Sequence, residues 1–344
     1  MLNRRNLLKA GAFMATTSMV PWSTARAADD KVTFVSWGGS TQEAQTEAWA
    51  TPFTAATQIP VVQDGPTDYG KLKAMVESGN VMWDVVDVEG YYAYRFAKLG
   101  LLEPIDYTVV NRDDLDPRLA FEYGVGSFMS SYVLAYNKNF VQGELTTWAD
   151  LFDIQKFPGK RAVYKWAGIG PLEMALLADG VEPSKLYPLD LDRAFAKLDT
   201  IKSNIVWWGS GAESQQLIAS GEAPIGMFWN GRIYFMQKDG LDSLAVSWKQ
   251  NIPGPDILVV PKGAPNKAAA MKFIAEAASA RGQATFANLS AYAPTNSAAI
   301  PLIKPEILPV MPFTYKNEDV PLGLEYWSEN VDEISKRWYA WQSA

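Results

Sequence analysis

The 344-residue sequence contains no cysteine and no histidine, and these two absences exclude several kinds of chemistry. Without cysteine there is no disulfide and no thiolate nucleophile, and without histidine there is no Ser-His-Asp triad and no imidazole base. A zinc site of cysteine and histidine ligands is excluded as well. Composition does not exclude a carboxylate site for Mg²⁺ or Ca²⁺, but no loop of the EF-hand type is present. We therefore expect no metal and no other cofactor.

The amino terminus has the pattern of an export signal. Arg4-Arg5 precedes Leu7 and Lys9, a weakly apolar run follows over residues 10–20, and residues 25–27 (Ala-Arg-Ala) form a small-x-small cleavage site. The apolar run is too short to span a membrane. The paired arginines resemble a twin-arginine signal, although the Sec route also tolerates them. We expect cleavage after Ala27 and a periplasmic location.

Basic clusters are missing from the rest of the chain. Removing the four basic residues of the predicted signal from the 31 lysines and arginines, against 38 acidic residues, leaves a net charge of −11. An acidic exported chain of this kind is a poor partner for nucleic acid or anionic lipid. We expect a monomer that binds a small molecule.

Aromatic residues are abundant by contrast, with 13 tryptophans and 15 tyrosines in a chain that is 48% hydrophobic. A chain of this length and composition can bury a large core and usually forms more than one domain. Most of these rings belong in the core. Some are suited to surround a small organic ligand, because aromatic faces attract apolar groups and cations.

Residues 225–229 predict a short buried strand that ends at Asn230-Gly231, just before Arg232. Ligands of open α/β sheets bind at the carboxyl ends of strands. There Trp229 offers a flat apolar wall, Asn230 an amide, and Arg232 a planar set of donors that matches a carboxylate. The alternative interpretation is a helix entry or hairpin with a surface arginine.

A second strand end lies near the amino terminus. Residues 31–35 predict a strand, and a glycine-rich turn follows in which Trp37 is the only large side chain. Ser40 and Glu43 have the spacing of a capping box, which would open the next helix. The turn lacks the Gly-Lys-Ser/Thr ending of a phosphate loop. Trp37 is thus either a ligand contact at the mouth of the sheet or a packing residue.

Two further positions carry carboxylates at strand ends. Residues 84–89 predict a buried strand whose end presents Glu89 and, after one glycine, Tyr91. Asp256 precedes a predicted strand over residues 257–261. Each carboxylate suits a ligand ammonium. The alternatives are a helix cap and a packed ring for Glu89 and Tyr91, and a solvated loop residue for Asp256.

The order of the predicted elements indicates an α/β protein with two domains around a cleft. Strands alternate with helices, and a long strand near residues 132–137 and the strand over 257–261 are the two places where the chain crosses between domains. We assign residues 28–136 and 261–344 to one lobe and residues 137–260 to the other.

Several short motifs, taken in order, support a family resemblance. They are Trp37, residues 84–86 (Asp-Val-Val), 147–151 (Thr-Trp-Ala-Asp-Leu), 157–159 (Phe-Pro-Gly), 226–231 (Gly-Met-Phe-Trp-Asn-Gly), 256–264 (Asp-Ile-Leu-Val-Val-Pro-Lys-Gly-Ala) and 292–296 (Tyr-Ala-Pro-Thr-Asn). Together they resemble the extracytoplasmic solute-binding proteins of ABC importers, in the spermidine/putrescine-binding branch. The similarity extends over essentially all of the chain after residue 27.

The resemblance implies a two-lobed periplasmic-binding-protein fold of type II, which closes on a solute and docks on a membrane permease. It also implies that Trp37, Glu89, Tyr91, Trp229 and Asp256 line the ligand cleft. The sequence departs from the polyamine pattern in one region, because residues 165–170 contain no acid where carboxylates would hold ligand amines.

Arg232 is a second departure, because a buried arginine would repel a polyamine. Coulomb repulsion in a closed cleft is on the order of a few kcal/mol, enough to select between ligands. The hypothesis is that Arg232 binds a carboxylate while Asp256 or Glu89 binds an ammonium, with Trp37 and Trp229 against the methylenes. This favours an ω-amino acid such as γ-aminobutyrate over a diamine.

Two other classes of function compete with this hypothesis. An exported hydrolase or lyase would need a pair of carboxylates, a Ser-Lys pair or a tyrosine, and no spacing singles out such a set. A sensor protein coupled to a chemoreceptor would share the fold and the cleft. We therefore expect a binding protein and not an enzyme.

Overall fold

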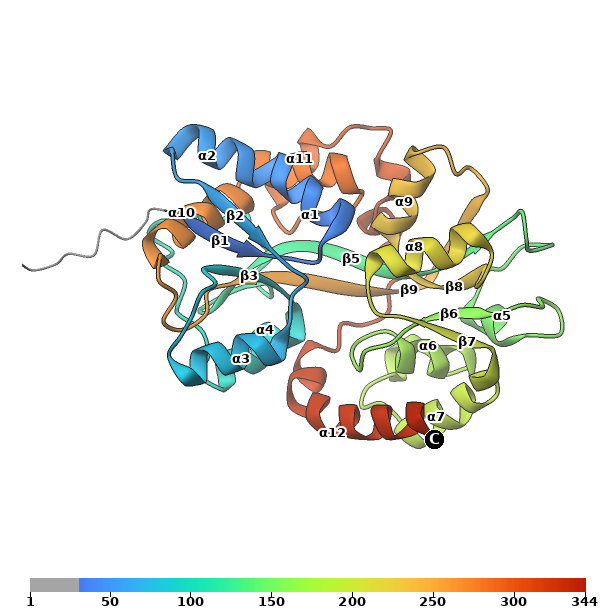
Figure 1. Ribbon diagram of the computed structural model, residues 1–344. Coiled ribbons are helices and arrows are strands. Elements are labelled where there is room, and N and C mark those ends of the chain that lie inside the picture. Colours follow the sequence, from blue (N-terminus) through green and yellow to red (C-terminus); the bar gives the residue numbers. More distant parts are fainter. Residues whose placement is uncertain (1–30) are drawn as a thin grey trace, which may run out of the picture.

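The computed structural model describes residues 31–344, so the predicted export signal lies outside the described residues (Figure 1). Two α/β halves lie side by side on one mixed sheet of nine strands, in the order β2-β1-β3-β9-β5-β8-β6-β7 with β4 beside β5. The strands are β1 (Val32–Val35), β2 (Val61–Asp64), β3 (Val85–Glu89), β4 (Ala120–Phe121), β5 (Gly124–Asn137), β6 (Arg161–Tyr164), β7 (Ile205–Trp208), β8 (Ile225–Trp229) and β9 (Leu244–Val259).

Twelve α-helices within residues 31–344 cover the two faces of the sheet (Figure 1). They are α1 (Gly39–Gln45), α2 (Thr51–Thr57), α3 (Tyr69–Ser78), α4 (Gly90–Lys98), α5 (Trp148–Phe152), α6 (Pro171–Ala178), α7 (Leu191–Asp199), α8 (Gly211–Ser220), α9 (Asn230–Lys238), α10 (Lys267–Ala278), α11 (Ala280–Ser290) and α12 (Leu324–Ser343). In this part of the chain no helix is both long enough and apolar enough to cross a lipid bilayer.

Each half has a small parallel sheet at its centre. In the first half β1 pairs in parallel with both β2 and β3, and in the second half β6 pairs in parallel with both β7 and β8. Strands of such sheets are buried on both faces and mostly apolar, and all four residues of β6 and the first four of β3 are buried, with Arg161 and Asp87 as the charged exceptions. Because parallel strands end at the same edge, the turns after β1, β3 and β8 face the region between the halves.

Two long antiparallel strands join the halves. β5 has 14 residues and β9 has 16, and they pair along most of their length, with register shifts between Gly126 and Phe128 and between Tyr132 and Leu134. β9 also pairs with β3 in the first half, and β5 pairs with β8 in the second. Both predicted crossings are present. The return strand begins at Leu244, well before the predicted residue 257, because its polar first part pairs with β5.

The carboxyl-terminal helix α12 contacts both halves (Figure 1). It packs against α4 of the first half, where Trp327 lies 5.8 Å from the ring of Tyr91. In the second half the indole N–H of Trp338 donates to the carbonyl of Lys165 over 2.8 Å. Trp327 and Trp338 are both buried, so this helix is part of the core at its inner face. The division into two lobes at residues 136 and 260 remains a proposal.

Candidate functional site

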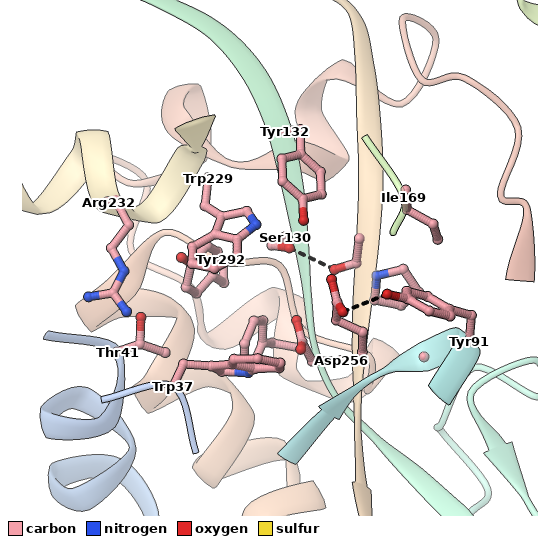
Figure 2. A pocket seen from close by; sticks show the side chains of 15 residues that line it. Trp37, Thr41, Tyr91, Ser130, Tyr132, Ile169, Trp229, Arg232, Asp256 and Tyr292 are labelled. Carbon is pink, nitrogen blue, oxygen red and sulfur yellow. Dashed lines mark hydrogen bonds between the residues drawn. The ribbon is translucent and has the colours of Figure 1, made fainter. Parts of the chain in front are cut away.

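The ends of β1, β3 and β8 meet the middle of β5 and β9 around a narrow space, which we call the inner cavity and which, with the solvent-open part included, has about 460 Å³ of empty volume (Figure 2). All six residues predicted as ligand contacts line it. They are Trp37, Glu89, Tyr91, Trp229, Arg232 and Asp256. The structure thus brings together side chains that are far apart in the sequence and come from both halves. Their role in binding remains a prediction.

Aromatic rings form the walls of the inner cavity. Trp37 follows β1 and Trp229 ends β8, and their ring centroids lie 6.3 Å apart across the boundary between the halves. Tyr132 of β5 lies 6.1 Å from Trp229. The indole Nε1 of Trp37 and the hydroxyl of Tyr132 are buried without a hydrogen-bond partner among the described residues. Buried polar atoms are normally paired, so both atoms are suited to a bound ligand.

Arg232 reaches one end of the inner cavity from the first turn of α9 (Figure 2). Its side chain is buried, and burial lowers the pKa of its guanidinium. Nη1 donates to the hydroxyl of Ser40 over 3.0 Å and Nη2 to the carbonyl of Gly38 over 3.1 Å, both in the first half. Nε has no partner among the described residues. Arg232 is therefore a buried cation held by neutral groups.

The contact with Ser40 corrects one prediction. Helix α1 begins at Gly39 and its capping position is Gly38, which has no side chain to form a cap. The expected Ser40–Glu43 capping box is wrong, because Ser40 already lies inside the helix. Its hydroxyl accepts a hydrogen bond from Arg232 instead.

Gly211, at the start of α8, leaves room for the guanidinium. A Cβ atom at this position would lie 2.2 Å from Nε of Arg232 and 2.3 Å from Cζ. No such contact is sterically allowed, so the residue here has to be glycine if Arg232 keeps its place. The position of the cation is thus set by a helix of the second half as well as by Gly38 and Ser40.

Carboxylates line the other end of the inner cavity. Glu89 of β3 and Asp256 of β9 are directly opposite each other in an antiparallel pair. Glu89 Oε2 accepts hydrogen bonds from the hydroxyls of Tyr69 over 3.0 Å and Tyr91 over 2.8 Å. Burial raises the pKa of Glu89 to about 7. Burial also raises the pKa of Asp256 well above its usual range, and the nearby carboxylates of Asp87 and Glu89 raise it further.

Asp87 is a third buried carboxylate, two residues before Glu89 on β3. It accepts a hydrogen bond from Gln45 Nε2 over 2.6 Å and another from Ser127 over 3.1 Å. Burial raises its pKa to about 7. It does not line the inner cavity, but when ionised it raises the pKa of Asp256.

The two ends of the inner cavity therefore carry opposite charge with no internal neutralisation. None of the ion pairs formed within residues 31–344 involves Arg232, Glu89 or Asp256. Figure 2 shows Arg232 beside Thr41 at one end, Asp256 and Tyr91 at the other, and Trp229 with Tyr292 between them. Such a cavity matches a short molecule with a carboxylate at one end and an ammonium at the other.

Seven lining side chains had not been predicted: Thr41, Phe128, Ser130, Tyr132, Ile169, Pro255 and Tyr292. Tyr292 lies in a motif that was recognised, and its ring stacks on Phe128 with centroids 4.8 Å apart. The others gave no signal, because they lie within a helix, a long strand or a loop and not at a strand end. Thr41 Oγ1 is buried without a partner among the described residues, beside Arg232.

Two polar residues near the inner cavity have structural roles. The amide of Asn230 accepts from the backbone N–H of Ser131 over 3.0 Å and donates to the carbonyl of Ala291 over 2.9 Å, so it is not available to a ligand as the sequence suggested. Glu173 is buried and accepts from the Gly170 backbone, from Tyr187 and from Trp327. In residues 31–344 no three acidic side chains gather in a way that could hold a metal ion.

The comparisons with known proteins identify the family of the chain. The family model of bacterial extracellular solute-binding proteins matches residues 48–308. The γ-aminobutyric acid-binding protein of Pseudomonas aeruginosa is 36% identical over 329 residues, which cover 93% of each chain. Spermidine/putrescine-binding periplasmic protein 1 of Haemophilus influenzae is 26% identical over 330 residues, which cover 89% of this chain and 86% of the relative.

Among solved structures, the GABA receptor Atu4243 superimposes with a TM-score of 0.84 at 55% sequence identity, covering 91% of this chain and 97% of the receptor. The chain therefore belongs to the bacterial extracellular solute-binding protein family, and it is a solute-binding protein of the ABC-importer type. The family resemblance and the two-lobed α/β fold expected from the sequence are both confirmed.

Proposed function

We propose that this protein captures a short ω-amino acid, with γ-aminobutyrate as the best candidate, in the inner cavity. The observation that carries the proposal is the separation of charge. Among residues 31–344, Arg232 has no carboxylate partner, and Glu89 and Asp256 have no cationic partner. The ligand carboxylate pairs with Arg232, its ammonium pairs with Asp256 or Glu89, and its methylenes lie between Trp37 and Trp229.

The energetics favour a zwitterion over a diamine. A buried charge left without its partner costs about 3–5 kcal/mol, because the protein interior solvates it poorly. An ω-amino acid neutralises both ends of the inner cavity at once. A diamine neutralises the carboxylates but leaves Arg232 unpaired and adds a repulsive ammonium beside it. An α-amino acid carries both charges on one carbon and cannot reach both ends.

The relatives support the same ligand class. The γ-aminobutyric acid-binding protein and the GABA receptor are 36% and 55% identical to this chain, whereas the polyamine-binding relative is 26% identical. The greater similarity to the γ-aminobutyrate binders agrees with the sequence of residues 165–170, which contains none of the carboxylates that a polyamine would need.

The cellular role follows from the family. We infer that the loaded protein delivers its solute to the membrane permease of an ABC importer in the periplasm, as a monomer. The predicted signal over residues 1–27 and the periplasmic names of several relatives support this location. The competing enzyme hypothesis lacks a supporting observation, since the relatives are binding proteins and the buried carboxylates lie opposite an arginine that no reaction requires.

Calorimetry on the purified protein tests the ligand class. The titrants are γ-aminobutyrate, 5-aminovalerate, putrescine, spermidine and α-aminobutyrate. We expect tight binding of the first two and binding at least a hundredfold weaker of the diamine, the triamine and the α-amino acid. Tighter binding of putrescine than of γ-aminobutyrate would reject the ω-amino acid while leaving the family assignment intact.

A further inference from the structure

The inner cavity faces one more carboxylate than a simple ω-amino acid can neutralise. Arg232 balances the carboxylate of the ligand, and the single ammonium balances either Asp256 or Glu89 but not both. These two acids are direct neighbours across β3 and β9. Like charges directly opposite in an antiparallel pair repel each other, and in the free protein a bound proton relieves this repulsion, in agreement with the raised pKa values of both groups. A cationic ligand group can take the place of that proton.

A second cavity of about 1270 Å³, which we call the outer cavity, adjoins the first. Four residues line both cavities and form the boundary between them: Trp37, Glu89, Tyr91 and Trp229. Arg232 and Asp256 line only the inner cavity. Glu89 is thus the one charged side chain that faces both spaces, while Asp256 serves the inner cavity alone.

The contacts of Glu89 leave one of its oxygens available. Oε2 accepts from Tyr69, which lines the outer cavity, and from Tyr91 at the boundary. No hydrogen bond formed within residues 31–344 ends at Oε1. The raised pKa of Glu89 agrees with a carboxylate that lacks a counter-ion.

The outer cavity is also lined by Asp68 and by Lys71, whose ammonium pairs with Asp64 over 3.4 Å, and its aromatic part is suited to an organic cation. The rings of Tyr69 and Tyr92 stack with centroids 3.5 Å apart, and the indole of Trp166 is 44% exposed at the mouth. Aromatic faces attract ammonium groups within about 6 Å, by roughly 0.5–1 kcal/mol at exposed sites. An acid at the base of an aromatic enclosure is the usual arrangement for binding an alkylammonium.

From this count of charges we propose that the cleft also accepts ω-amino acids whose nitrogen carries an aminoalkyl chain. The inference rests on the proposed function. The carboxylate pairs with Arg232, the secondary ammonium with Asp256, and the distal primary ammonium with Glu89 at the boundary, with its chain along Tyr69 and Trp166. Such a ligand neutralises all three charges, which neither γ-aminobutyrate nor putrescine does.

Competition calorimetry with three ligands tests this inference. The ligands are γ-aminobutyrate, N-(3-aminopropyl)-γ-aminobutyrate and its counterpart without the distal amine, N-butyl-γ-aminobutyrate. We expect the aminopropyl compound to bind within threefold of γ-aminobutyrate or more tightly, and the butyl compound to bind at least tenfold more weakly than the aminopropyl compound. A wild-type ratio of the Kd of the aminopropyl compound to that of γ-aminobutyrate above three overturns the inference.

The variant Glu89→Gln tests whether Glu89 is the residue that pairs with the distal ammonium. It keeps the shape and hydrogen-bonding capacity of the side chain, and it is expected to raise the ratio of the Kd of the aminopropyl compound to that of γ-aminobutyrate at least threefold. A smaller change overturns the inference and indicates that one ammonium is shared by both carboxylates. If this variant does not fold, Trp166→Ala takes its place, and the same threefold change in the Kd ratio is required. Phe140→Ala is the control, because Phe140 is 52% exposed and lies outside both cavities.

The failure of this inference is separate from the failure of the proposed function. Binding of γ-aminobutyrate without the aminopropyl compound overturns only the extension into the outer cavity. Binding of neither compound counts against the proposed function itself.

Discussion

The two ends of the inner cavity hold opposite charges by different means. At the basic end one side chain, Arg232, extends from the second half and is fixed by a hydroxyl and a carbonyl of the first half and by the missing side chain of Gly211. At the acidic end Glu89 and Asp256 are fixed by the pairing of β3 with β9. The basic end therefore depends on closure of the two halves, whereas the acidic end is built into the sheet of one half.

This difference has a consequence for recognition. A ligand carboxylate at Arg232 adds a charge partner to a side chain that already bridges the halves, so its binding favours the closed arrangement. A ligand ammonium meets carboxylates whose backbone is already in place. We therefore expect the acidic end to attract amines in general, and the basic end to select the amines that also carry a carboxylate.

The largest expected effect comes from removing the cation. Arg232→Ala leaves the ligand carboxylate buried without a partner, which costs on the order of 3 kcal/mol, so γ-aminobutyrate binding should weaken by about a hundredfold or more. Calorimetry measures the affinity of the variant for γ-aminobutyrate. Arg281→Ala is the control, since that arginine is exposed and pairs only with Glu276. The same variant should bind putrescine better than the wild type does. Unchanged γ-aminobutyrate affinity would show that Arg232 faces away from the ligand.

Asp256→Asn should weaken γ-aminobutyrate binding by about tenfold to a hundredfold, less than Arg232→Ala, because Glu89 remains as a second acceptor for the ammonium. A titration with γ-aminobutyrate, followed by the fluorescence of the tryptophans in the cleft, measures this loss of affinity. Asp192→Asn is the matched control, since that carboxylate is exposed and pairs only with Arg337. A loss equal to that of Arg232→Ala would mean that Glu89 does not compensate.

Gly211→Ala tests whether the position of the guanidinium matters, apart from its charge. The added methyl displaces Arg232 from Gly38 and Ser40, and we expect about a tenfold loss of γ-aminobutyrate affinity by calorimetry. Gly70→Ala is the control, because Gly70 also lies in the first turn of a helix, and its Cβ would meet only the side chain of Asp68, at 3.3 Å. Equal affinities of the two variants would refute the close-contact argument.

The smallest expected effect is a dependence of stability on pH at the acidic end. Asp87 has an ordinary pKa of 3.8 and a folded pKa of about 7. Between these values the folded chain holds a proton that the unfolded chain has released, so raising the pH destabilises the folded state. We expect the unfolding free energy of the ligand-free protein to fall as the pH rises from about 4 to about 7.

Asp87→Asn removes that titration and leaves the hydrogen bond from Gln45 in place. Urea unfolding at several pH values should then show a shallower slope for the variant than for the wild type. Equal slopes would indicate that Asp87 is ionised in the folded protein, with Glu89 and Asp256 carrying the shared protons instead.

Much of the fold follows from local patterns. Residues 225–229 are an apolar run, residues 84–89 alternate valines with acids, and a glycine stands at or just after the end of each; the structure has β8 and β3 there, each leading directly into a helix. The six site residues were found because each lies at or close to the end of a predicted strand. The Ser40 capping box and the free amide of Asn230 were wrong because a contact with the other half or with a distant loop outweighed the local motif.

The sequence by itself determined the order of strands and helices, because this depends on hydrophobic periodicity and on neighbours within a few positions. Its motifs, through their resemblance to a known family, also implied the family and six of the residues that line the inner cavity. Only the tertiary structure decided that Glu89 lies opposite Asp256 and that Arg232 rests against Gly211 and bridges to Gly38 and Ser40. It also revealed Tyr132 and Tyr292 as lining residues. Such contacts join residues far apart in the chain, and strand register and the approach of the two halves are set by the packing of the whole molecule.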